Sequence, residues 1–190
     1  MAKMAARRAP TLTVTDWMQP LPPANRWVLH GDATVRAHAT PVWGVAFSET
    51  ACRATLEGAR ATLWLGPDEY LLLNLAPFAD GPQSASAMEQ ALERALADTP
   101  HALVDVSHRQ FALQLTGPHA SAILNGGCPL DLDLREFPVG MCTRTIFAKA
   151  DIVLWRTGAE VFHLEAWRSF SGYITGVLGE IAREYYGPIK

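Results

Sequence analysis

Two stretches of this chain share a pattern at a fixed separation, and the pattern is typical of a β-hairpin followed by a helix. In the first stretch, two apolar runs flank the turn formers Gly66-Pro67-Asp68-Glu69. Four of its residues recur 91 positions later: Leu63, Trp64, Glu69 and Leu73 match Leu154, Trp155, Glu160 and Leu164. This candidate internal duplication predicts an α+β fold, in which two related halves are built around antiparallel sheets with helices packed on them.

Further strands and helices are predicted on either side of the hairpins. The apolar run 42–47 is predicted to be a strand, and residues 87–97 carry an apolar stripe at helical spacing, with Ser84 or Ser86 as the cap. Residues 102–123 predict a strand, a turn, a second strand and a helix that opens at Gly117-Pro118.

Three glycines occupy one face of a predicted C-terminal helix. Gly172, Gly176 and Gly179 are spaced four and three residues apart. They indicate either the close approach of another backbone or a loosely ordered helix, because glycine in a helix costs about 1 kcal/mol relative to alanine.

The first 40 residues differ in composition from the rest. Four prolines surround Trp17, and proline resists both helix and sheet: Pro10, Pro20, Pro22 and Pro23. We therefore expect a disordered start and an extended arm over residues 1–40, packed either over its own domain or over another subunit, and a folded domain over residues 41–190.

Composition limits the classes of function. The net charge is −3 and the basic residues are scattered, so nucleic acid is not an expected ligand. Cys52, Cys128 and Cys142 lack metal-ligand spacing, and the six histidines form no i, i+4 pair, so we expect no metal site. Free thiols are typical of the cytoplasm, and no apolar run is long enough for a membrane span.

Adjacent Ser107 and His108 resemble a catalytic dyad. Neighbouring side chains on a strand point to opposite faces, so the pair shares a hydrogen bond only where the backbone turns. The alternative is structural: Asp105 and Ser107 bind backbone groups at a strand end while His108 packs. A hydrolase using Ser107 and His108 is the weakest of the functions considered.

The stretch Asp105-Val106-Ser107-His108, followed by the Gly117-Pro118 helix start, resembles the folate-binding domain of the glycine-cleavage aminomethyltransferase (T-protein) family. The segments 135–147 and 151–162 follow the order of the same family. Taken over the whole chain, including the segments 65–73 and 167–178, the sequence is more similar to the gamma-subunit family of heterotetrameric sarcosine oxidases. The resemblance implies an aminomethyltransferase-like fold with two related halves.

The same resemblance implies an accessory chain with no active site of its own. Its partners would be the alpha, beta and delta subunits, which would carry FAD, FMN, NAD and tetrahydrofolate and oxidise sarcosine to glycine, with hydrogen peroxide and formaldehyde or methylene-tetrahydrofolate as products. In the aminomethyltransferases an acidic residue at the place of Asp151 contacts folate, but the residues that precede Asp151 here differ from theirs. Asp151 is thus a vestigial folate candidate, and a free-standing folate-binding one-carbon transferase or folate sensor is the alternative function.

Overall fold

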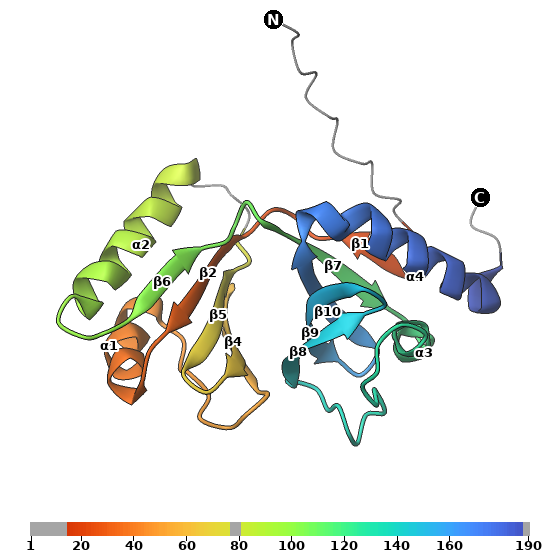
Figure 1. Cartoon of the computed structure of the whole chain (residues 1–190), viewed down its shortest axis with the longest axis horizontal. Helices are drawn as coiled ribbons and strands as arrows, with labels where there is room; N and C mark the ends of the chain where they lie inside the picture. The colour runs from red at the N-terminus through yellow and green to blue at the C-terminus, as the bar shows by residue number, and fades with distance from the viewer. Residues whose placement is uncertain (1–14, 77–80, 188–190) are drawn as a thin grey trace, which may run out of the picture.

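The computed structural model describes residues 15–76 and 81–187, which form two halves lying side by side (Figure 1). The first half is an antiparallel sheet with the strand order β3-β4-β5-β2-β6, and two helices pack on one of its faces. Its elements in chain order are β2 (Asn25–His30), α1 (Ala33–Trp43), β3 (Ala54–Glu57), β4 (Arg60–Gly66), β5 (Glu69–Asn74), α2 (Gly81–Leu96) and β6 (Ala102–Asp105).

The second half is also a five-stranded antiparallel sheet, with the order β1-β7-β10-β9-β8. Its helices pack on the face that is turned away from the first sheet. Its elements are β1 (Met18–Pro20), β7 (Gln110–Thr116), α3 (Ala120–Asn125), β8 (Cys142–Phe147), β9 (Ala150–Gly158), β10 (Val161–Trp167), the short 3-10 helix η2 (Arg168–Phe170) and α4 (Ser171–Tyr186).

The two sheets have the same topology, which confirms that the chain contains two related halves. Strands β2 to β5 correspond to β7 to β10, and α1 and α2 to α3 and α4. Each hairpin shifts its register near the turn and ends on a cross-strand pair that includes a glycine. These pairs are Gly66–Glu69 and Gly158–Val161, so the halves align at an offset of 92 residues.

The offset of 91 predicted from the sequence is therefore wrong by one residue. It matches Leu63, which packs between the two sheets, with Leu154, which packs against the helices of the second half. Side chains of a strand alternate between its two faces, so a slip of one residue exchanges the faces. At an offset of 92, Leu63 corresponds to Trp155, and both lie between the sheets.

One edge strand of each sheet is exchanged between the halves. Strand β1 directly precedes β2 in the chain but pairs with β7 of the other sheet, and β6 directly precedes β7 but pairs with β2. Both links therefore cross between the halves in Figure 1. The strand, turn and strand predicted over residues 102–116 exist, but they belong to different sheets.

The predicted strand over residues 42–47 is wrong, because residues 33–43 form α1. The Asp32 carboxylate accepts hydrogen bonds from the backbone N–H of Thr34 (2.8 Å) and Val35 (3.2 Å), which caps the helix. Gly44 ends it in a left-handed conformation, with φ of 80°. Val35, Ala39 and Trp43, spaced four residues apart, face the core.

The predicted domain boundary at residue 40 also differs from the structure. Part of the predicted arm lies in residues 1–14, outside the described residues. Where the structure describes it, the segment contains β1, β2 and most of α1. Strand β2 is flanked on both sides by other strands, so residues 25–40 belong to the first half and are not an arm. None of the described helices is long and apolar enough to cross a membrane.

The close backbone approach predicted as one alternative at the three C-terminal glycines is not found at Gly176. The buried face of α4 consists of Ser171, Ile174, Leu178 and Ala182, whereas Gly176 faces open space. The close approach is made by Gly126, after α3, where an added Cβ would lie 2.8 Å from the Ile181 side chain of α4. The predicted helix start at Pro118 lies two residues before the observed one at Ala120.

Replacing Gly176 by alanine is expected to raise the free energy of unfolding by about 0.5 to 1 kcal/mol, because alanine favours the helix and nothing obstructs its methyl group. Gly126→Ala is the contrasting variant, and we expect it to destabilise the protein. Urea denaturation of both variants measures the difference. Equal effects of the two substitutions would contradict this packing.

Candidate functional site

A buried ionic cluster joins the two sheets. The Arg26 guanidinium, from β2, donates to both carboxylate oxygens of Glu165, on β10, at 2.7 and 3.0 Å. His163 lies 2.7 Å from the same carboxylate through its Nε2 atom. The side chains of Arg26 and Glu165 are 2 % and 0 % exposed. The three groups therefore satisfy one another away from solvent, as a buried carboxylate requires.

The alignment of the halves shows how unusual this cluster is within the fold. His163 and Glu165 correspond to Leu71 and Leu73 of β5, which are fully buried leucines. The second half thus presents an imidazole and a carboxylate where the first half presents two leucines. The duplicated scaffold does not require these polar groups.

A cavity of about 360 Å³ lies beside the cluster, between the two sheets. Val28 and Leu65 of the first half and Val153 of the second contribute to its apolar wall. Glu165 and Gln110 form part of its polar wall, and the buried Oε1 atom of Gln110 has no hydrogen-bond partner among the described residues. Gln110 also lines a second cavity, of about 210 Å³, together with Arg26 and Ser107.

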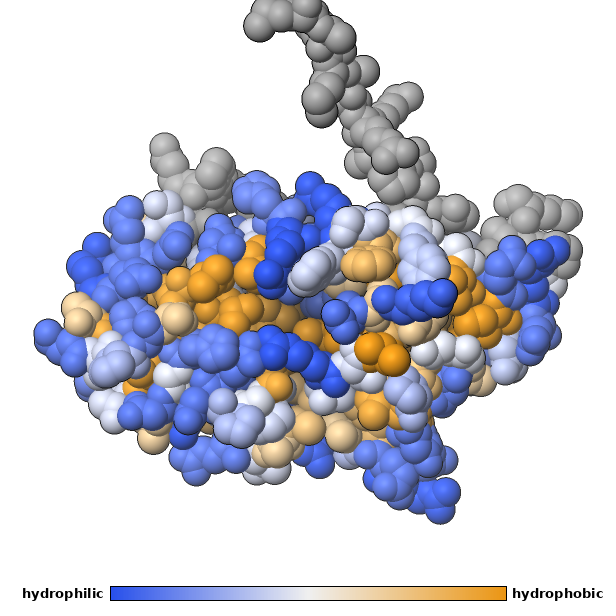
Figure 2. Space-filling view, in the orientation of Figure 1, coloured by the Kyte–Doolittle hydropathy of each residue, from blue (hydrophilic) through white to orange (hydrophobic). Residues whose placement is uncertain are grey.

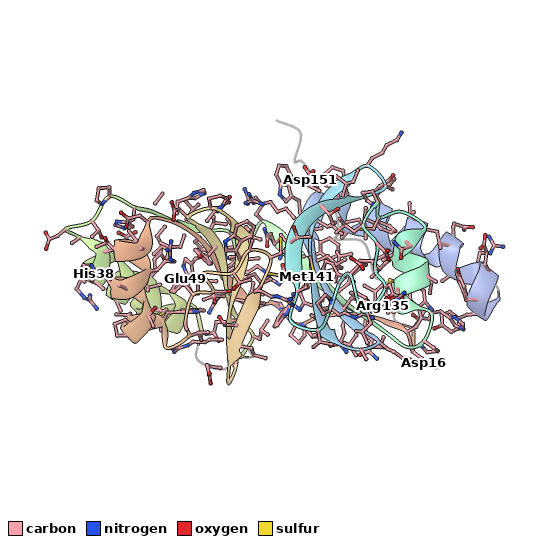
Figure 3. All side chains as sticks on the ribbon, turned by 90° about the horizontal axis from the view of Figure 1, so that it is seen from below. Asp16, His38, Glu49, Arg135, Met141 and Asp151 are labelled. Atoms are coloured by element: carbon pink, nitrogen blue, oxygen red, sulfur yellow. The ribbon has the colours of Figure 1, made fainter. Side chains whose placement is uncertain are left out.

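Three of the side chains that line the larger cavity are both charged and exposed: Arg109, Arg144 and Asp151. Asp151, the second residue of β9, is exposed and lines the cavity. Arg109 lies over the ring of Trp167, with its guanidinium carbon 5.3 Å from the ring centroid. Arg144 forms a two-pronged ion pair with Glu69 of the first half. Figure 3 shows Asp151 and Met141 at the boundary between the halves.

The predicted location of Asp151 at the start of a hairpin is confirmed, because it follows the turn between β8 and β9. The structure adds that Asp151 shares a cavity with Glu165 and Gln110. The sequence analysis did not identify Glu165, Gln110, Arg26 or His163 as site residues. Arg26 and Glu165 are 139 residues apart, and neither residue belongs to a recognisable pattern.

The structural role predicted for Asp105 and Ser107 is confirmed. The Asp105 carboxylate accepts the backbone N–H of Ser107 at 2.7 Å, and the Ser107 hydroxyl accepts the backbone N–H of Arg26 at 2.8 Å. His108, predicted to pack, is instead exposed in the turn between β6 and β7. No hydrogen bond joins Ser107 to His108 in the part of the chain that the structure describes. The geometry therefore does not support the hydrolase.

Cys142 lies in the apolar layer between the sheets, where its backbone N–H donates to the carbonyl of Cys52 at 2.9 Å. Burial raises the pKa of the Cys142 thiol to about 12. An unfolded thiol titrates at roughly 8.5. The contribution of this thiol to stability is therefore fully present below about pH 8.5, and it is lost as the pH rises toward 12.

We expect Cys142 to resist alkylation in the folded protein, because only the thiolate reacts and its population at pH 8 is lowered about a thousand-fold by such a shift. Cys52, which is partly exposed, is expected to react first. Iodoacetamide labelling followed by peptide mass spectrometry measures both rates, and labelling in urea provides the control. Equal rates in the native protein would contradict the burial of Cys142.

Within residues 15–76 and 81–187, no group of three His, Cys, Asp or Glu side chains could hold a metal ion.

Comparisons with known proteins agree with this architecture. A family described as "Sarcosine oxidase, gamma subunit family" matches residues 30–184. The sarcosine oxidase subunit gamma of Corynebacterium sp. strain U-96 is 34% identical over 125 residues, which cover 66% of this chain and 57% of that protein. The subunit of strain P-1 is 34% identical over 131 residues, which cover 69% and 60%. The chain thus spans less than two thirds of the length of these relatives.

Two solved structures resemble the fold. A chain of the heterotetrameric sarcosine oxidase from Corynebacterium sp. U-96, in complex with pyrrole 2-carboxylate, superposes with a TM-score of 0.80 at 28% identity, over 91% of this chain and 86% of that chain. The glycine cleavage system aminomethyltransferase T from Bartonella henselae gives a TM-score of 0.61 at 14% identity, over 85% of this chain and 44% of that chain. The second likeness concerns the fold alone, and it confirms the predicted aminomethyltransferase-like architecture.

Proposed function

This chain belongs to the sarcosine oxidase gamma subunit family, and from that premise we propose that it is a non-catalytic accessory subunit of a heterotetrameric sarcosine oxidase. The observation that carries the proposal concerns the polar side chains at the junction between the two halves, which bind one another or backbone groups. Arg26, His163 and Glu165 bind one another, while Asp105 and Ser107 bind backbone groups. The Arg26–Glu165 pair joins the two halves, and the Asp105 carboxylate and the Ser107 hydroxyl are engaged by backbone N–H groups of the chain.

The proposed assembly contains alpha, beta and delta subunits as partners. In that assembly FAD, FMN, NAD and tetrahydrofolate would be bound by the partners. The complex would oxidise sarcosine to glycine and yield hydrogen peroxide with formaldehyde or methylene-tetrahydrofolate. A cytoplasmic location is part of the proposal, supported by Cys52, Cys128 and Cys142, which are all free thiols.

Co-production of this chain with the other sarcosine oxidase subunits of the same genome tests the proposal. With an affinity tag on the alpha subunit, this chain is expected to co-purify in equal stoichiometry, and its omission is expected to reduce the yield of assembled, sarcosine-oxidising complex. The chain produced alone is expected to be colourless. Failure to co-purify, together with stable and monomeric behaviour in sedimentation, would overturn the proposal.

A second candidate function has one specific observation in its favour. Asp151, the folate candidate, lines the 360 Å³ cavity between the sheets. Calorimetric titration with tetrahydrofolate discriminates between the two functions. Micromolar binding that is lost in Asp151→Ala, but kept in the exposed control Asp131→Ala, would favour a folate-binding protein. A titration without heat would leave the accessory subunit as the supported function.

A further inference from the structure

One edge of the first sheet, at β6, is apolar and uncovered in the part of the chain that the structure describes. Among the strands that the structure describes, β6 is the last in its sheet and pairs only with β2. Val104 is 51% exposed and lies directly opposite the half-buried Val28. Figure 2 shows apolar side chains gathered over β6, β2 and β5, beside the junction with the second half. We call Ala102, Val104 and Val28 the β6 patch.

The other half provides an internal comparison for this patch. Strand β1 occupies the place in the second sheet that β6 occupies in the first, and the pair Gln19–Gln114 corresponds to Val104–Val28. At this fold position one half therefore has the exposed Gln19 beside the half-buried Gln114, and the other has the exposed Val104 beside the half-buried Val28. An apolar pair is not a requirement of this position, so its exposure points to a covering partner.

The edge of β6 also offers free backbone groups. The N–H of Val106 donates to the carbonyl of Arg26 at 2.9 Å, which fixes the alternation of the antiparallel ladder. The peptide groups of Leu103 and Asp105 consequently point away from β2, and no described residue binds them through its backbone. Asp105 is the one charged residue of β6. The strand has no lysine, proline or bulge of the kind that protects an exposed edge strand.

A positive charge lies close to the patch. Arg109 lines the same cavity as Val28, and no described carboxylate lies within ion-pair distance of its guanidinium. The Arg109 guanidinium lies over the ring of Trp167, which is 45% exposed. A complementary chain would therefore place apolar side chains over the valines and an acidic side chain near Arg109.

We propose that an extended segment of another sarcosine oxidase subunit adds to the β6 edge as a sixth strand. Its alternate apolar side chains cover the β6 patch, and an acidic residue pairs with Arg109. Main-chain hydrogen bonds to Leu103 and Asp105 hold the segment, and the patch selects its side chains. This inference rests on the proposed function, because the partner is a subunit of the same assembly.

The substitution Val104→Lys tests the patch in the assembled complex. Val104 is an exposed side chain, so the variant is expected to fold. Its affinity for the other subunits, measured by interferometry on the tagged partners, is expected to fall at least ten-fold. Gln19→Lys, at the corresponding exposed position of β1, is the matched control and is expected to change the affinity less than two-fold. Unchanged affinity in Val104→Lys, or equal losses in both variants, overturns the inference.

Amide hydrogen exchange tests the added strand. The amides of Leu103 and Asp105 are expected to exchange rapidly in the chain alone and at least ten-fold more slowly in the complex. Unchanged exchange at these two amides overturns strand addition. The proposal is also overturned if the chain alone self-associates and Val104→Lys abolishes this self-association, because the edge would then bind a second copy of the chain. If the wild-type chain does not join the other subunits at all, the proposed function itself fails, which is a result distinct from a failure of the β6 patch alone.

Discussion

Replacing Glu165 by glutamine is expected to lower the free energy of unfolding by about 3 to 5 kcal/mol, which is the loss typical of removing one charge from a buried pair. The substitution keeps the shape of the side chain but leaves the Arg26 guanidinium 2% exposed and without a counter-charge. His163 loses the charge of its carboxylate partner at 2.7 Å as well. Urea denaturation at pH 7 measures the effect.

Two controls separate the charge of Glu165 from its volume. Arg183 and Glu180 form an exposed ion pair on α4, and Arg183→Ala is expected to cost less than about 0.5 kcal/mol. The double variant Arg26→Met/Glu165→Leu removes both charges and is expected to recover most of the stability, since the first half already accepts Leu73 at the corresponding position. A loss below about 1 kcal/mol in Glu165→Gln would contradict the structural importance of this pair.

The hairpins were predictable because local chemistry determines them. Pro67 and Asp68 form the turn between β4 and β5, and the apolar runs on both sides become strands that other strands flank. The register between the halves was not predictable in the same way. Leucine occurs on both faces of β5, so Leu164 can be matched to Leu72 as well as to Leu73 until the faces are known.

The missed helix α1 shows a competition between two patterns. Val42, Trp43 and Val45 are apolar and have side chains that favour strands, whereas the helix signal comes from the Asp32 cap and from core residues four positions apart. Tertiary packing decided in favour of the helix, because Trp43 meets Trp27 edge-on at 5.9 Å. The exchange of β1 and β6 is a still longer-range feature, and no local pattern indicates it.

The candidate site was the least predictable part. Resemblance directed attention to Asp151, and the structure does place this residue at a cavity. The groups that hold the junction together come from β2 and β10, at opposite ends of the chain, and each looks like an ordinary polar residue of a strand. Buried polar partners become recognisable only when the sheets are packed face to face.

Replacing Trp27 by alanine is expected to remove about 3 to 5 kcal/mol of stability and to do so for both halves at once. Trp27 is fully buried in the core between α1, α2 and the first sheet. Each sheet takes an edge strand from the segment that leads into the other half, and the two sheets share an apolar layer that includes Leu63 and Trp155. Loss of order in one half therefore removes a strand and a packing face from the other.

The measurement is amide exchange in increasing urea, followed separately in peptides from β5 and β10. Both peptides are expected to lose protection at the same urea concentration, and in Trp27→Ala both midpoints are expected to move together, because a two-state unit has one transition. Leu56→Ala, at a side chain 51% exposed on β3, is the control and is expected to leave both midpoints nearly unchanged. If β10 keeps its protection while β5 loses it, the halves unfold independently, and the exchanged strands do not couple them.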